Sequence, residues 1–162
     1  MNFSPLLDSN PTIMIHAGSA CAAILLGPVI FYNRKGTGLH RWLGKLWAAL
    51  MAVAIVSSAF LSGIKIWGPF SPIHFFTVLG AVSLINGMRY VWQGRIDAHK
   101  AAMKGLYFWS LGVAGVLSFL PGRIMSQVLF PSNETGGFVI VILVFASALV
   151  LNSALRRKRT LW

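Results

Sequence analysis

Residues 138–155 read FVIVILVFASALVLNSAL, and the four residues that follow them, 156–159, read RRKR. The first stretch is nearly all apolar and approaches the ~20 residues that a helix needs to cross a hydrocarbon core. A basic run directly after such a stretch is typical of a helix that ends at a membrane surface, where basic side chains meet lipid headgroups. This part of the chain therefore predicts a transmembrane helix with a lipid-facing anchor.

The rest of the chain has the same character. Apolar residues make up 56% of the 162 residues and charged residues only 10%, with a mean hydropathy of +0.72, whereas a soluble domain has about 25% charged residues. Four more apolar runs lie near 12–32, 43–64, 73–92 and 105–120. We therefore predict an all-α polytopic membrane protein, forming one integral membrane domain over residues 1–162. Its expected architecture is an antiparallel four-helix bundle plus a fifth transmembrane helix at 137–155.

The basic residues predict the orientation. Twelve of the fourteen Lys and Arg residues fall in the connections after the first and third apolar runs and in the tail, and the other two are Lys65 and Arg123. Cytoplasmic segments carry such an excess, which predicts an external N-terminus and a cytoplasmic C-terminus. An odd number of spans is required for that outcome, in agreement with five. The net charge of +11 thus points to a bacterial inner membrane and not to nucleic acid.

Helix starts are marked by capping residues. Asn10-Pro11 and Ser71-Pro72 each place an N-cap residue before a proline at the first helical position, which is favourable there. Thr37 or Gly38 is expected to cap the second helix, and Asp97 is placed to cap the fourth.

Four histidines stand out, one in the opening turns of each of the first four helices: His16, His40, His74 and His99. Their spacing is nearly regular, with 58 residues from His16 to His74 and 59 from His40 to His99, which suggests a duplicated helical hairpin. In the predicted topology, His16 and His74 lie near the outer face and His40 and His99 near the cytoplasmic face. Two imidazoles from facing helices in apolar surroundings are what a bis-histidine haem requires. The leading hypothesis is a b-type haem electron carrier or reductase with one such pair near each face.

Two other interpretations remain open. His40 and His99 with Asp97 make a two-histidine, one-carboxylate set that suits iron, zinc or copper, although Asp97 and His99 point apart if both are helical. The single cysteine, Cys21, excludes a multi-thiolate site. Alternatively, the histidines serve helix packing in a non-catalytic membrane assembly subunit.

Basic side chains complete the predicted site. Arg41, Lys45, Lys100 and Arg123 are candidates for haem propionates or an anionic substrate, since guanidinium and ammonium groups pair with such anions. Arg123 follows Pro121-Gly122 and could instead reach lipid phosphates at a helix end. The partners expected are membrane lipid and a quinone or small redox substrate, and the oligomeric state stays open.

Several of these blocks also resemble a known family. His16-Ala17-Gly18, the run 39–44 (LHRWLG), the run 94–100 (GRIDAHK) and the run 120–123 (LPGR) are similar to a family of predicted bacterial membrane proteins, a domain of unknown function, over roughly residues 12–130. The resemblance implies a multi-span helical fold and no particular activity. A more distant analogy, in histidine placement and not in sequence, is with transmembrane diheme b-type cytochromes. The inner histidines of this chain are shallower than in that pattern.

Overall fold

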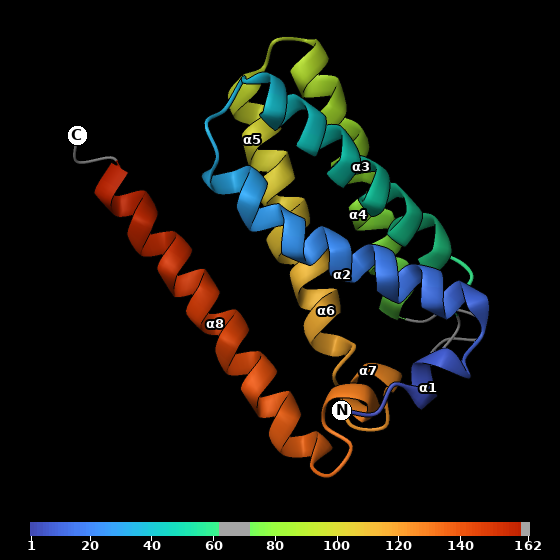
Figure 1. Ribbon diagram of the computed structural model, residues 1–162. Helices are drawn as coiled ribbons and strands as arrows, with labels where there is room; N and C mark the ends of the chain where they lie inside the picture. The colour runs from blue at the N-terminus through green and yellow to red at the C-terminus, as the bar shows by residue number, and fades with distance from the viewer. Residues whose placement is uncertain (62–71, 160–162) are drawn as a thin grey trace. The chain divides into compact units, whose positions relative to one another are not determined.

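The computed structural model (Figure 1) describes residues 1–61 and 72–159, and these residues form helices and no strand. They divide into two compact units, one formed by Ser9–Ala114 and the other by Met1–Asp8 with Gly115–Trp162. The predicted all-α fold class is confirmed. The prediction of a single integral membrane domain is not tested by this division into units.

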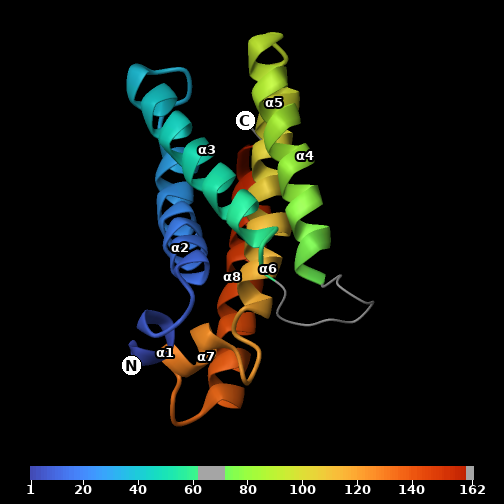
Figure 2. The same ribbon diagram turned by 90° about the vertical axis from the view of Figure 1, so that its right-hand side faces the viewer.

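The unit Ser9–Ala114 holds the four histidines. Its elements are α2 (Pro11–Tyr32), α3 (Gly38–Ser58), α4 (Pro72–Trp92), α5 (Ile96–Gly105), the π-helix η1 (Leu106–Gly112) and the start of α6 (Val113–Leu117). Helical backbone runs without a gap from α5 through η1 to α6. In sequence order α2 contacts α3, α3 contacts α4 and α4 contacts α5, and η1 contacts both α4 and α2. Neighbouring helices are antiparallel, so the α2–α3 and α4–α5 connections lie at the same end (Figure 2).

Two of the expected caps are confirmed and one is wrong. The side chain of Asn10 accepts a hydrogen bond from the amide of Thr12 at 2.9 Å, and that of Thr37 accepts one from the amide of His40 at 3.2 Å. Asp97 does not cap α5. The helix begins two residues earlier than that cap requires, at Ile96 with Arg95 at the N-cap position, because the chain turns at Gly94, which has a φ of +72°. Asp97 thus lies inside the first turn, where a carboxylate still favours the helix dipole. Ser71 lies outside the described residues.

A proline inside α2 explains one of two interhelical hydrogen bonds at this level of the unit. Pro28 has no amide hydrogen, so the carbonyl of Ile24, four residues earlier, lacks its helical donor. The hydroxyl of Tyr107 in η1 donates to that carbonyl at 3.0 Å, and the indole N–H of Trp47 in α3 donates to the preceding carbonyl, that of Ala23, at 2.9 Å. Neighbouring helices commonly satisfy backbone groups that a proline frees in a membrane helix.

The apolar core of this unit lies around the contact between α2 and η1. Its buried apolar residues are Ala23, Ile30, Trp47, Met51, Met103, Leu106 and Leu111. The ring of Tyr107 lies where a Cβ of Gly27 would project, so the glycine allows η1 to approach α2 closely. Packing and hydrogen bonding therefore fix η1 against α2 at one level.

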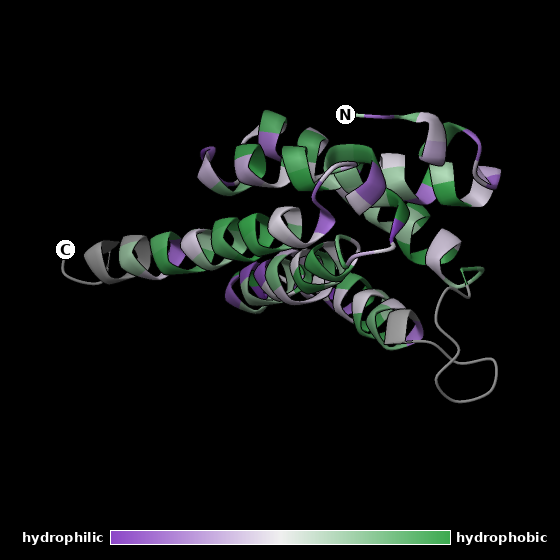
Figure 3. Ribbon diagram, turned by 90° about the horizontal axis from the view of Figure 1, so that it is seen from below, coloured by the Kyte–Doolittle hydropathy of each residue, from purple (hydrophilic) through white to green (hydrophobic). Residues whose placement is uncertain are grey.

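The other unit contains α1 (Ser4–Leu7), α7 (Ile124–Leu129) and α8 (Glu134–Arg159). The N-terminal segment packs on α7, with the amide of Asn2 donating to the carbonyl of Val128 at 2.9 Å. The Glu134 carboxylate accepts a hydrogen bond from the amide of Gly122 at 2.6 Å. Figure 3 shows hydrophobic residues along most of α8, as expected for the apolar run quoted first.

Three helices of the described residues are long and apolar enough to cross a membrane: Pro11–Tyr32, Gly38–Ser58 and Glu134–Ala154. They correspond to the first, second and fifth predicted spans. The third predicted span matches α4, and the fourth falls in the run from α5 to α6. That run begins at Ile96, before its apolar stretch, as expected for a helix that carries His99. The second helix begins at Gly38, directly after the predicted cap Thr37, so that His40 belongs to it as expected. The count of five spans stays a prediction.

Candidate functional site

His16 lies in the second turn of α2 and points to α3. Its Nδ1 is 2.9 Å from the carbonyl oxygen of Ala54 and 3.2 Å from the hydroxyl of Ser57. A carbonyl oxygen can only accept a hydrogen bond, so Nδ1 carries the proton and donates it. In the neutral imidazole, the lone pair then belongs to Nε2, which is the atom that could bind a metal ion.

His74 lies at the same end of this unit. Ser58, at the end of α3, is hydrogen-bonded through its hydroxyl to that of Thr77 in α4, at 2.7 Å, and Thr77 is one turn after His74. Ser57, next to Ser58, contacts His16. We call this end, which carries His16, His74, Ser57, Ser58 and Thr77, the Ser58 end. The structure therefore brings α2 and α4 to one level, each with its histidine.

His99 lies at the opposite end, in the first turns of α5. Its Nδ1 donates to the carbonyl oxygen of Gly87 in α4 at 2.8 Å. Met103, one turn after His99, occupies the space where a Cβ of Gly87 would project. The close approach of α5 to α4 at this glycine therefore brings His99 within reach of the main chain of α4. As at His16, Nε2 keeps the lone pair of a neutral ring.

His40 lies at this second end too, in the first turn of α3. It is within electrostatic range of both His99 and Lys35. Its Nδ1 is buried and has no hydrogen-bond partner among the described residues. A buried polar atom without a partner costs about 1–3 kcal/mol, so this ring nitrogen is a candidate position for a ligand.

Asp97 is not brought into a site with the two histidines. Its side chain is 96% exposed and forms an ion pair with Lys100 at 2.9 Å. Among the residues that the structure describes, no group of three or more His, Cys, Asp and Glu residues is close enough to hold a metal ion. The described part of the chain thus shows no set of histidines completed by Asp97.

The candidate cationic residues divide between the units. Arg41 and Lys45 are exposed at the start of α3, and Lys100 is exposed at the start of α5. Arg123 belongs to the other unit, where it directly precedes α7. The first three are therefore at the end that carries His40 and His99.

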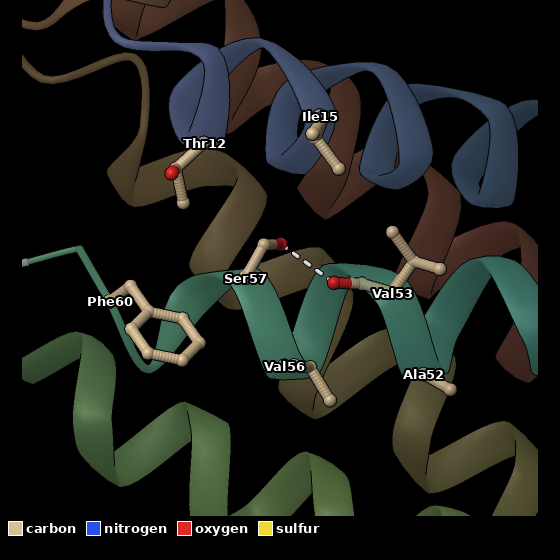
Figure 4. Close-up of a pocket in the computed structure, with 7 residues that line it drawn as sticks. All are labelled: Thr12, Ile15, Ala52, Val53, Val56, Ser57 and Phe60. Atoms are coloured by element: carbon tan, nitrogen blue, oxygen red, sulfur yellow. Dashed lines mark hydrogen bonds between the residues drawn. The ribbon is translucent and has the colours of Figure 1, made fainter.

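An apolar groove of about 430 Å³ opens between α2 and α3 at the Ser58 end, and Figure 4 shows its lining residues: Thr12, Ile15, Ala52, Val53, Val56, Ser57 and Phe60. The Ser57 hydroxyl, which contacts His16, also donates to the carbonyl of Val53 at 2.7 Å. The groove therefore adjoins the histidine of that end.

Sequence reasoning missed the groups that orient the histidines. The acceptors at Ala54 and Gly87 are main-chain carbonyls, which every residue type has, so the sequence cannot reveal them. The sequence does reveal three hydroxyl residues, Ser57, Ser58 and Thr77, and hydroxyl side chains in apolar helices commonly join neighbouring helices. Searching for hydroxyls level with each histidine could have found these three residues.

These features define the class of the molecule: an all-helical integral membrane protein, with its histidines at the two ends of one helical unit. The chain belongs to the family of predicted membrane proteins DUF2306, whose family model matches residues 13–157. No curated protein and no solved structure matches it. The resemblance inferred from the histidine-bearing blocks is thus confirmed, while the analogy to diheme cytochromes depends on histidine placement alone.

Proposed function

We propose that the chain is a transmembrane redox protein that binds b-type haem through paired histidines, His16 with His74 and His40 with His99. One observation carries the proposal. At each end of the unit, a histidine donates its Nδ1 hydrogen to a main-chain carbonyl of a neighbouring helix, Ala54 at one end and Gly87 at the other. This outer hydrogen bond is typical of metal-ligating histidines, because it fixes the tautomer and orients Nε2.

The surrounding residues fit such a group in their chemistry. At the Ser58 end, Ile15, Val56 and Phe60 supply apolar walls beside His16, and apolar walls favour retention of a porphyrin. At the other end, Arg41 and Lys100 supply cations for propionates. When bound, a haem supplies a one-electron iron couple whose potential depends on its axial ligands and their hydrogen bonds.

The proposal includes an orientation and partners. With basic segments on the cytoplasmic side, His40 and His99 face the cytoplasm of a bacterium and His16 and His74 face outward. Electrons then pass between the two faces, and a quinone or small redox substrate serves as donor or acceptor. Arg123, which belongs to the other unit, stays a separate candidate for an anionic substrate on the outer side.

A second candidate function is supported by His40. Its buried, unpartnered Nδ1, in electrostatic range of His99, also suits a non-haem iron, zinc or copper ion held by two imidazoles, with its remaining positions open to water or substrate. Such a site is independent of the Ser58 end. It therefore makes a distinct prediction, namely metal without haem.

The test is spectroscopic. Protein purified in mild detergent from haem-replete cells is expected to give the dithionite-reduced spectrum of a low-spin bis-histidine b haem. Since two ligands share one iron, His16→Ala and His74→Ala should cause the same loss of haem, and the double variant should lose no more than either single one. Ser57→Ala is the matched control. It removes a contact to His16 while the Ala54 carbonyl remains, so haem should be retained.

Three other results are informative. A colourless protein without iron would overturn the haem proposal, and metal analysis of the same sample would then detect a non-haem ion. If neither is present, and losses of stability at His16 and His74 are simply additive, the histidines are packing residues. The chain would then be a non-catalytic membrane subunit.

A further inference from the structure

One end of the unit Ser9–Ala114 concentrates positive charge. We call it the basic end: residues 32–45 and 89–104, where α2 and α4 finish and α3 and α5 begin. Its basic residues are Arg34, Lys35, Arg41, Lys45, Arg89, Arg95, Lys100 and Lys104, and its only carboxylate is Asp97. We propose that this end is a binding site for the headgroup of an anionic phospholipid.

One carboxylate in the sequence of this end cannot balance its eight Lys and Arg residues. Asp97 pairs with Lys100 at 2.9 Å, and Arg95 lies over the ring of Tyr90 at 4.8 Å from its centre. Arg41 and Lys45 form no ion pair with a carboxylate of the described residues. Seven positive charges thus remain in excess at this end, which favours an anionic partner.

The cations are arranged as two similar pairs. Arg41 and Lys45 are four residues apart on α3, and Lys100 and Lys104 are four residues apart on α5, so each pair occupies one helix face. Each pair directly follows the histidine of its helix, and the α2–α3 and α4–α5 connections lie at the same end of the unit (Figure 2). Both pairs therefore lie at one end, where a lipid phosphate can meet cations from two helices.

Exposed aromatic side chains indicate that the anion is a lipid and not a soluble acidic protein. Tyr32, Trp42 and Trp92 are 61%, 62% and 77% exposed, and all three lie in the same turns as the basic residues. Tyr and Trp concentrate at the headgroup level of membranes. They therefore place the cations at the depth of lipid phosphates, where each basic residue attracts anionic lipid.

The experiment compares lipids bound by the whole chain. Delipidated protein in neutral detergent is mixed with equimolar phosphatidylglycerol and phosphatidylcholine, and retained lipids are counted by native mass spectrometry. The unchanged chain should retain phosphatidylglycerol preferentially. The variant Arg41→Gln/Lys45→Gln/Lys100→Gln/Lys104→Gln should lose about tenfold or more of that preference. The matched control removes the same charge from the tail, by Gln substitutions at 156–159, and should lose less than about twofold.

Several outcomes overturn the proposal. An equal loss in both variants means that the preference follows net charge alone, and an unchanged ratio means that the four cations bind no lipid. Displacement of the lipid by millimolar inorganic phosphate assigns the site to a free anion instead.

Should the fourfold variant fail to fold, Arg41→Gln/Lys45→Gln and Lys100→Gln/Lys104→Gln are used separately, each with an expected loss of about threefold. Haem content is measured in parallel. Loss of haem with lipid preference intact assigns these cations to propionates, so that the lipid site and the proposed redox function are tested separately.

Discussion

Thr37 contributes more to the start of α3 than its size suggests. Its hydroxyl oxygen accepts the amide hydrogen of His40 at 3.2 Å, one of the donors that a helix leaves without an internal partner. The same turn carries His40 and Arg41, so the cap also fixes two of the candidate site residues. The conformation of the first turn of α3 therefore depends on the Thr37 side chain.

We expect Thr37→Ala to lower the free energy of unfolding by about 1 kcal/mol, since removal of an N-cap hydroxyl typically costs that much. Thr37→Ser retains the oxygen and should cost only a few tenths as much. Thermal unfolding followed by circular dichroism in detergent measures both. If the two variants have equal stability, the hydroxyl does not cap α3.

At the same scale, the sequence predicted where the histidines are and not what they contact. His16 and His99 were predicted at opposite ends because helix direction alternates along the chain. Their acceptors could not be predicted, since Ala54 and Gly87 contribute main-chain oxygens that any residue possesses. The position of Asp97 relative to the start of α5 explains why this carboxylate does not join the histidines. The chain enters α5 at Ile96, and the carboxylate is then free to pair with Lys100 on the outside of the helix.

At the scale of elements, a hydrogen bond that is missing within α2 is replaced by one from η1. Pro28 leaves the carbonyl of Ile24 without a donor, and the hydroxyl of Tyr107 supplies one. The π-helical stretch that carries Tyr107 is a form of helix often found at functional sites. A periodic pattern of apolar residues cannot predict such a stretch, because its extra residue per turn arises from packing and not from composition.

This dependence predicts a coupling between two substitutions. Tyr107→Phe should cost about 1–2 kcal/mol in the unchanged chain, because the Ile24 carbonyl loses the donor that replaces its missing helical one. In the Pro28→Ala background, the new amide at position 28 can donate to Ile24, so the same change should cost at least about 1 kcal/mol less. Unfolding of the four chains in detergent measures the difference.

Trp47→Phe supplies the control for that cycle. Its acceptor, the carbonyl of Ala23, faces the amide of Gly27, which is present in both backgrounds. The cost of Trp47→Phe should therefore be the same in the unchanged chain and in the Pro28→Ala background. A Tyr107→Phe cost that is equally insensitive to the proline would mean that Tyr107 serves packing only.

For the whole molecule, composition and charge distribution decided most of what could be predicted. The apolar runs anticipated helices at Pro11–Tyr32, Pro72–Trp92 and Glu134–Arg159 to within a few residues. Two helices extend beyond their apolar stretches, to Gly38 and Ile96, because basic residues there belong to the interface and not to the hydrocarbon core. The capping residues predicted these two starts to within two residues. The division into two units was not anticipated, since nothing in the composition changes near Gly115.

Orientation is the prediction on which the pairing of histidines by membrane face depends. The excess of Lys and Arg at the α2–α3 and α4–α5 connections and in the tail puts those segments in the cytoplasm. Reporter fusions after Arg95 and after Arg159 should therefore give cytoplasmic activity, and a fusion after Ser132 should give external activity. Arg95 and Arg159 lie on one side if both the α5–α6 run and α8 cross or if neither does, and an external Ser132 between them requires both to cross. An external reading after Arg159 would mean that one of them does not cross, and the count of five would be wrong. An external reading after Arg95 would reverse the assignment of His40 and His99 to the cytoplasmic face.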